Sequence, residues 1–380
     1  MSEIEVPAGV PEMTPEWMTS VLTASGRLRE GRVASVDAQR IGIGRGYASQ
    51  NLRLNLAYDE AGAGPASLIA KLPMPFELPP EAKALIGQLY AREINWYREL
   101  KADTPVRAPA MVWSGMEPEA GKFCLLLEDL GHLVEKGQVA SCSTEEARLV
   151  VRTLGRVHAA WWESERLANT PWLPTSAQQA TLVQSLWQTA WPGFWEVEGP
   201  RLSPEFEAVG LKTGAAIPTL LEKGHASGRT LVHGDYRIEN FLFGPLGTDD
   251  ELVVLDWQVV SFGNGPRDLA YFIGQNIEEA SRREQEQELL RLYYSELVRG
   301  GVTGYSFDRC YDDYRTGLLL AMYIAINAVG TLVKQIDANP VLQRDATFQQ
   351  AMESGQRLIR AIVSRNVTAI LENRAQEMLA

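Results

Sequence analysis

The segment LVHGDYRIEN, residues 231–240, combines a carboxylate and an amide at a spacing that suits phosphoryl transfer. Asp235 follows a short apolar run, so its carboxylate is predicted to lie in a turn, where it can accept a hydrogen bond from a substrate hydroxyl. Asn240 offers an amide oxygen five positions later, and Asp256 offers an anionic oxygen after a second apolar run. Oxygen ligands of this kind suit Mg²⁺, which binds through few protein groups together with phosphates and water.

These motifs resemble the aminoglycoside phosphotransferase superfamily, in its ecdysteroid-kinase-like branch, which shares the protein-kinase fold. The HGDxxxxN pattern is similar to the HRDxxxxN catalytic loop, with the same interval from Asp235 to Asn240. Asp256 resembles the metal-binding Asp of the kinase DFG segment, although Trp257 and Gln258 replace Phe and Gly. The likeness covers most of the chain, from about residue 35 to 275, and ends with GPRDLA.

The resemblance also assigns roles to two residues upstream. Lys71, in IAKLP, matches the lysine that pairs with nucleotide phosphates, and Glu93, 22 residues later, resembles its partner on a helix. Taken singly, a Lys at a strand end is often a solvated edge residue and a helical Glu usually faces water. Together and in this order, the residues imply ATP and Mg²⁺ as cofactors.

A glycine-rich turn, IGIGRGYASQN, precedes Lys71 and departs from the spacing of protein kinases. It is either a hairpin tip or a cover for the nucleotide phosphates, in which case Gly44, Gly46 and Ser49 supply donors. The resemblance further implies that adenine bonds to backbone near Glu128 and Leu130.

The remaining polar residues near the motifs allow structural as well as chemical roles. His233 is expected to be a hydrogen-bonding residue of the turn rather than a base. The family pattern suggests that Asp268 braces the turn, and His158 is most simply a packed helix residue. Arg237 either contacts phosphate oxygens, as a catalytic residue, or pairs with a surface acid.

The periodicity of the chain changes along its length. Residues 35–42, 51–58 and 67–73 read as strands, followed by a helix from residue 80 and two more strands near 108–115 and 122–130. From residue 143 the pattern is mainly helical, with Ser143 and Glu146 at capping-box spacing. We therefore predict an α+β, bilobal, protein-kinase-like fold. A small lobe with an antiparallel sheet and one helix (1–128) binds nucleotide, and a larger, mainly helical lobe (129–380) carries catalysis and substrate binding.

Composition limits the class of partner. The net charge of -12 disfavours nucleic acid and anionic membranes, and the first residues do not read as a signal peptide, so a cytoplasmic location is expected. Three widely spaced cysteines predict neither a disulfide framework nor a zinc site. The apolar run 318–333 is shorter than a membrane span and is expected to be a buried helix. No feature of the sequence indicates the oligomeric state.

The acceptor is the least determined part of the prediction. Six of the ten tryptophans fall between residues 161 and 195, and they either fill a core or line a wide apolar pocket. An acidic cluster typical of aminoglycoside binding is lacking. We therefore expect a hydroxylated, uncharged and partly apolar small molecule, with choline- or aminoglycoside-type acceptors as alternatives.

Two other functions are compatible with part of this pattern. One is a nucleotide-binding regulator on the same fold, which the intact set of charged residues argues against. The other is metal-assisted hydrolysis by Asp235 and Asp256, which leaves Lys71 and the glycine turn without a role.

Overall fold

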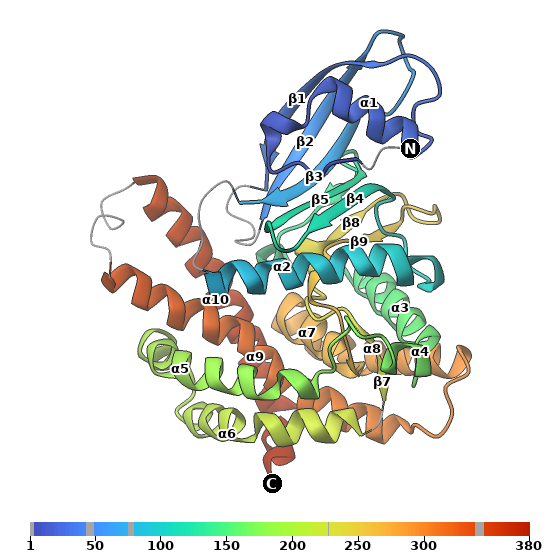
Figure 1. Cartoon of the computed structure of the whole chain (residues 1–380). Coiled ribbons are helices and arrows are strands. Elements are labelled where there is room, and N and C mark those ends of the chain that lie inside the picture. The colour runs from blue at the N-terminus through green and yellow to red at the C-terminus, as the bar shows by residue number, and fades with distance from the viewer. Residues whose placement is uncertain (1–3, 43–48, 75–79, 227, 339–345) are drawn as a thin grey trace. The chain divides into compact units, whose positions relative to one another are not determined.

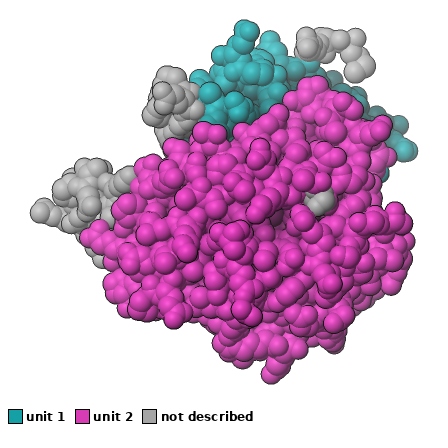
Figure 2. Space-filling model, turned by 90° about the horizontal axis from the view of Figure 1, so that it is seen from below, with its two compact units in different colours: residues 1–102, 107–134, 253–258 teal, residues 103–106, 135–252, 259–380 magenta. Residues whose placement is uncertain are grey.

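The computed structural model describes residues 4–42, 49–74, 80–226, 228–338 and 346–380. These residues form two compact units, coloured separately in Figure 2. Unit 1 contains the described residues of 1–102 together with 107–134 and 253–258. Unit 2 contains those of 103–106, 135–252 and 259–380.

Unit 1 is built on a five-stranded antiparallel sheet of order β1-β2-β3-β5-β4 (Figure 1). Its strands are β1 (Val33–Ile41), β2 (Ser49–Tyr58), β3 (Ser67–Pro73), β4 (Met111–Glu117) and β5 (Lys122–Glu128). Buried and partly buried residues alternate along β3, where Leu68, Ala70 and Leu72 are buried. Since side chains alternate between faces, Lys71 lies on the face opposite to these three residues.

Helix α1 (Pro15–Ala24) covers the apolar face of this sheet, where Met18 and Leu22 join Leu54 in one buried cluster. The sequence prediction of a single helix in this part of the chain missed α1. Its signals are present, because the Thr14 hydroxyl accepts a hydrogen bond from the amide of Trp17 and a proline occupies the first helical position.

The predicted helix from residue 80 is α2 (Pro80–Asn95), which continues as one π-helical turn, Trp96–Leu100. Tyr90 of α2 stacks on Phe123 of β5, with ring centroids 3.6 Å apart and an interplanar angle of 10°. This contact attaches the helix to the sheet, and Glu93 follows Tyr90 in the next turn.

Unit 2 is mainly helical, as expected from residue 143 onward. The capping box at Ser143 and Glu146 is formed at the start of α3, so this prediction is confirmed. The helices are α3 (Thr144–Ala160), α4 (Glu165–Ala168), α5 (Ala180–Glu198), α6 (Glu205–His225), α7 (Pro266–Asn276), α8 (Glu279–Arg299), α9 (Phe307–Ala338) and α10 (Ala346–Glu372).

Short strands interrupt the helices, and one pair of them frames the predicted catalytic turn. Strand β7 (Arg229–Val232) pairs antiparallel with β10 (Ser261–Asn264), with Val232 opposite Ser261. Three further short strands are β6 (Val134–Glu135), β8 (Phe241–Phe243) and β9 (Leu252–Val254). The predicted apolar pieces around the HGD motif are thus strands, and the motif itself lies in the turn after β7.

The apolar run 318–333 is part of α9, and Leu318, Met322 and Ile326 in it are buried. Across the described ranges, no helix has both the length and the apolarity required to cross a bilayer.

The tryptophans of α5 serve packing. Trp187 and Trp191 are buried and lie against α6, where a Cβ at Gly210 would approach the Trp191 ring to 1.8 Å and one at Gly214 would approach Trp187 to 2.6 Å. Only glycine at these two positions lets the helix backbone approach the indole rings so closely.

Candidate active site

Three residues predicted from the sequence meet in unit 1, and we call them the lysine cluster: Lys71 on β3, Glu93 on α2 and Asp256 after β9. The ammonium Nζ of Lys71 lies 2.7 Å from Oε1 of Glu93 and 3.1 Å from Oδ1 of Asp256. The Glu93 side chain is fully buried, whereas the carboxylate of Asp256 is partly exposed. The lysine is therefore held by one buried acid and one accessible acid.

The charges of this cluster depend on each other. Burial alone would lower the pKa of Lys71, but the carboxylates of Asp256 and Glu93 outweigh it and raise that pKa well above its usual value. Burial raises the pKa of Glu93, and the charge of Lys71 opposes this rise. Lys71 is thus a permanent cation, and its charge favours the ionised form of Glu93 against the effect of burial.

Backbone conformation and ring stacking fix the position of Asp256. Its φ of 65° lies in the left-handed region, which costs a non-glycine residue about 1–3 kcal/mol and persists only where the surroundings enforce it. The Trp257 ring stacks on Trp96 with a centroid separation of 3.9 Å and an interplanar angle of 4°. Because Trp96 begins the π-turn that continues α2, the stack joins the Asp256 segment to the helix carrying Glu93. Trp257, which stands where protein kinases have Phe, therefore helps to position Asp256.

Replacing Trp257 by Ala is expected to lower the free energy of unfolding by about 3–5 kcal/mol, because it removes a fully buried indole and its stack on Trp96. Trp257→Phe keeps an aromatic face but loses the hydrogen bond from Nε1 to the carbonyl of Val254, so a loss nearer 1–2 kcal/mol is expected. Urea denaturation of both variants measures the difference. Equal losses would show that the stack itself contributes little.

The second group of predicted residues meets in unit 2, in the turn from His233 to Asn240, which we call the catalytic turn. Both oxygens of Asp235 accept hydrogen bonds. Oδ2 lies 2.9 Å from Nδ2 of Asn240 and 3.2 Å from Nε of Arg237, and Oδ1 accepts the phenol of Tyr271 at 3.0 Å. Three donors therefore fix the orientation of this carboxylate.

Asp268 braces the catalytic turn, as the family pattern suggested. Its buried carboxylate accepts the backbone N–H groups of His233 at 2.6 Å and Gly234 at 2.9 Å. Burial alone would raise its pKa, but interactions with His158, His233 and the Gly234 amide outweigh burial and lower it. Gly234 has a φ of +84°, and a Cβ there would lie 2.7 Å from the carbonyl oxygen of Val259, so the turn requires glycine.

His158 belongs to the same buried network. Its Nδ1 lies 2.7 Å from the Tyr293 hydroxyl, and its Nε2 lies 3.5 Å from Oδ2 of Asp268. It is a packed helix residue, as expected, and it also supports Asp268. His233 has the structural role predicted for it, because its Nδ1 accepts the backbone N–H of Asp235.

Sequence reasoning missed Tyr271. A tyrosine within the apolar helix α7 looks like a core residue, but it lies three positions after Asp268 and so on the same side of the helix. Burial and the nearby Asp235 carboxylate raise the pKa of Tyr271 well above its usual value, so the phenol stays protonated and donates to Asp235. Because Asp268 was already expected to brace the catalytic turn, the helical spacing from Asp268 to Tyr271 was the signal that would have identified Tyr271.

Arg237 and Asn240 have further contacts within the turn. Arg237 also pairs with Glu239, with Nη1 2.9 Å from Oε2. The amide nitrogen of Asn240 donates to the backbone carbonyl of Asp235 at 2.8 Å as well as to its carboxylate. The nitrogen end of Asn240 is therefore occupied, and its oxygen end is the one suited to a cation.

The other predicted nucleotide contacts come from the glycine-rich turn and from the segment after β5. Gly44 and Gly46 lie outside the described residues, and Ser49 begins β2. The Glu128 carboxylate is engaged within unit 1 by both terminal nitrogens of Arg107, at 2.9 and 3.0 Å, and Leu130 is buried. With these side chains engaged or buried, the backbone is the part of this segment suited to recognising a base.

A search of solved structures finds kinase-like chains over nearly the whole length. A crystal structure described as a putative aminoglycoside phosphotransferase from Ralstonia eutropha matches with a TM-score of 0.54 and 15% identity, covering 95% of this chain and 98% of the other. The GDP complex of wild-type aminoglycoside 2'-phosphotransferase-IIIa matches with a TM-score of 0.51 and 13% identity, covering 92% and 98%. At these identities the likeness establishes the fold, and it confirms the predicted protein-kinase-like class.

The family model of the ecdysteroid kinase-like family matches residues 43–301, more than half of the chain. The chain belongs to this family. Among curated proteins no match was found. Membership confirms the predicted class of enzyme, a small-molecule kinase that transfers phosphate to a hydroxyl, and both the lysine cluster and the catalytic turn lie inside the matched range.

Proposed function

We propose that this member of the ecdysteroid kinase-like family is an ATP- and Mg²⁺-dependent phosphotransferase whose acceptor is a small, uncharged and partly apolar alcohol. The observation that carries the proposal is the set of three donors that fixes the Asp235 carboxylate. Its neighbour Gly234 and its donor Tyr271 line a small hollow. A carboxylate oriented in this way can accept the hydrogen bond of an acceptor hydroxyl and hold its oxygen toward a phosphate.

The residues present fit the implied cofactors. Asn240 and Asp256 supply an amide and a carboxylate oxygen, the hard donors that Mg²⁺ prefers, and no group of three or more acidic, His or Cys side chains suited to a metal occurs within the described part of the chain. Asn240 belongs to unit 2 and Asp256 to unit 1, and each supplies one such oxygen. When bound, Mg²⁺ would neutralise charge on the transferring phosphate.

Lys71 supplies the cation for the nucleotide phosphates. Glu93 holds its ammonium from the buried side, so Lys71 needs no reorganisation when phosphate arrives. Asp235 orients the acceptor, while Tyr271 and Asn240 keep that carboxylate in one rotamer. Arg237 binds both Asp235 and Glu239, which favours a role in holding the turn.

The hollow beside Asp235 supports an acceptor without positive charge. Gly234, Tyr271, Tyr323 and Ile324 are among the residues that line it, and Asp268 is its single acidic residue among those described. Both oxygens of Asp268 already accept backbone N–H groups. Arg267 adds a positive charge, which would repel an ammonium group. Aminoglycoside- and choline-type acceptors are therefore disfavoured.

Phosphate transfer from radiolabelled ATP to matched alcohols tests this proposal. Ringed alcohols with and without an amino substituent are compared with the purified protein, and the uncharged member of each pair is expected to have a kcat/KM at least about tenfold higher. Excess chelator is expected to abolish transfer. A preference for the amino alcohols would contradict the proposed acceptor class, and transfer that persists in chelator would contradict the metal dependence.

A further inference from the structure

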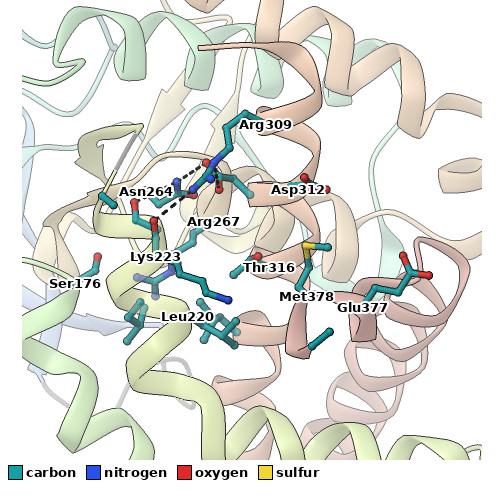
Figure 3. Close-up of a pocket in the computed structure, with 16 residues that line it drawn as sticks. Ser176, Leu220, Lys223, Asn264, Arg267, Arg309, Asp312, Thr316, Glu377 and Met378 are labelled. Carbon is teal, nitrogen blue, oxygen red and sulfur yellow. Dashed lines mark hydrogen bonds and ion pairs between the residues drawn. The ribbon is translucent and has the colours of Figure 1, made fainter. Parts of the chain in front are cut away.

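A larger pocket lies in unit 2, and none of the predicted site residues lines it. Its volume is about 520 Å³, within the range of roughly 300–1,000 Å³ found for small-molecule sites. It is formed by the end of α6, the starts of α7 and α9, and the residues after α10 (Figure 3). We call it the α6–α9 pocket.

The acidic side chains around this pocket are already engaged. Asp313 pairs with Arg309 at 3.1 Å and accepts further hydrogen bonds from Asn264 and Tyr305. Arg309, labelled in Figure 3, also donates to a backbone carbonyl of α6. Asp312 and Glu377 both pair with Arg315, at 3.2 and 2.6 Å. Each of these three carboxylates is thus paired with a neighbouring arginine.

Two cationic side chains on the wall of the pocket are not paired with a carboxylate of the described residues. Lys223 and Arg267 form no ion pair with a carboxylate in the described part of the chain, and in Figure 3 they lie on the opposite side from Asp312 and Glu377. Lys223 is exposed, whereas Arg267 is partly buried, and burial lowers its pKa. A partly desolvated guanidinium is stabilised by an anion that bonds to it.

Apolar side chains form another part of the wall. Leu220, Leu221, Leu320 and Met378 line the pocket beside the hydroxyl of Thr316. Cationic and apolar surfaces therefore face one cavity, and a ligand that satisfies both must carry a negative group on a compact hydrocarbon body.

We propose that the α6–α9 pocket binds a small organic anion, a carboxylate or phosphate monoester with an apolar body, through Lys223 and Arg267. The site is separate from the hollow beside Asp235, with which it shares only Arg267 and Leu320 among the described residues. Arg267 precedes Asp268, so the proposed anion would bind next to the residue that braces the catalytic turn.

Calorimetry with the full chain tests the proposal, using 4-phenylbutyrate and phenyl phosphate as anionic probes and 4-phenylbutanamide as the neutral match. A saturating non-hydrolysable ATP analogue is present so that binding at a nucleotide site is excluded. We expect at least one anion to bind at least about tenfold more tightly than the amide. If phenyl phosphate binds more tightly than 4-phenylbutyrate, the ligand of the pocket carries a phosphate group. If 4-phenylbutyrate binds more tightly, the ligand carries a carboxylate. Equal affinity of anion and amide, or no binding of either anion, would overturn the proposal.

Variants locate the bound probe. Lys223→Met and Arg267→Met are each expected to weaken anion binding at least about fivefold, and Thr316→Phe to block it by filling the cavity. Lys212→Met is the matched control, because Lys212 is exposed on the same helix but does not line the pocket, and it should bind the probe like the native chain. If Lys223→Met and Thr316→Phe both bind the anion unchanged, the α6–α9 pocket is not its site. Lys223 is exposed, so its replacement is not expected to disturb folding.

Discussion

The Asp235→Asn variant is expected to have a kcat about 10³-fold lower than the native enzyme, with nucleotide affinity changed by no more than about threefold. In the proposed mechanism Asp235 accepts the hydrogen bond of the acceptor hydroxyl, and an amide cannot take up that proton. The amide also presents an N–H group to the donors that bind the carboxylate at 2.9 to 3.2 Å. Steady-state phosphate transfer gives kcat, and calorimetry with an ATP analogue gives the affinity.

Tyr271→Phe is the matched control for this variant. It removes one donor to Asp235 but leaves the carboxylate, so kcat should fall only about tenfold. The two variants together separate the chemistry of the carboxylate from its orientation. If Asp235→Asn retained the native kcat, Asp235 would lose its central role, and if Tyr271→Phe were as inactive as Asp235→Asn, orientation alone would account for the effect.

Removing the charge of Lys71 should damage both activity and stability. Lys71→Met is expected to lower kcat/KM by about 10²- to 10³-fold, because it removes the cation that we propose for the nucleotide phosphates. It also leaves the fully buried carboxylate of Glu93 without its partner at 2.7 Å, which is expected to cost about 3 kcal/mol of unfolding free energy at neutral pH. Phosphate-transfer kinetics and urea denaturation measure the two effects.

The pH dependence of Lys71→Met has a definite sign. Burial already raises the pKa of Glu93, and without Lys71 the folded-state pKa rises further above its usual value of 4.5. Between these two values the folded chain binds more protons than the unfolded chain, so stability decreases as pH rises through this window. The stability lost at neutral pH should therefore be regained as the pH falls toward 4.5.

Two further variants isolate the buried charge. Lys71→Met with Glu93→Gln has no buried charge to desolvate, so it should recover most of the stability but none of the activity. Lys122→Met removes an ammonium on the neighbouring strand β5 that pairs with Glu117 at 3.4 Å on the surface, and it should change stability by less than about 0.5 kcal/mol. Failure of the double variant to recover stability would mean that Lys71 acts through packing rather than charge.

Local patterns in the sequence were enough to predict most elements that carry the site. Alternation identified β2 and β3, and a cap followed by helical spacing identified α3, because both signals depend on neighbouring residues alone. Helix α1 was missed although its cap at Thr14 and its proline are local signals too. The predicted residues within each unit also meet, since the interval of five in the HGDxxxxN motif places Asn240 beside Asp235 within one turn.

Contacts between distant segments could not be predicted in the same way. The stack of Trp257 on Trp96 joins residues 161 positions apart, and nothing in either local pattern indicates it. Tyr271 looks like a core residue until Asp235 is placed beside its hydroxyl. The sequence left core packing and a substrate pocket as alternatives for the tryptophans between 161 and 195, and none of them lines the hollow beside the catalytic turn or the α6–α9 pocket.

The sequence by itself determined the class of this protein, because a kinase is specified by a few charged residues in fixed order on strands and helices whose periodicity is local. Tertiary structure alone decided which groups hold those residues in place and where cavities lie. Orientation and cavity shape arise from packing between segments far apart in the chain, and the free energy of that packing depends on all of its partners together.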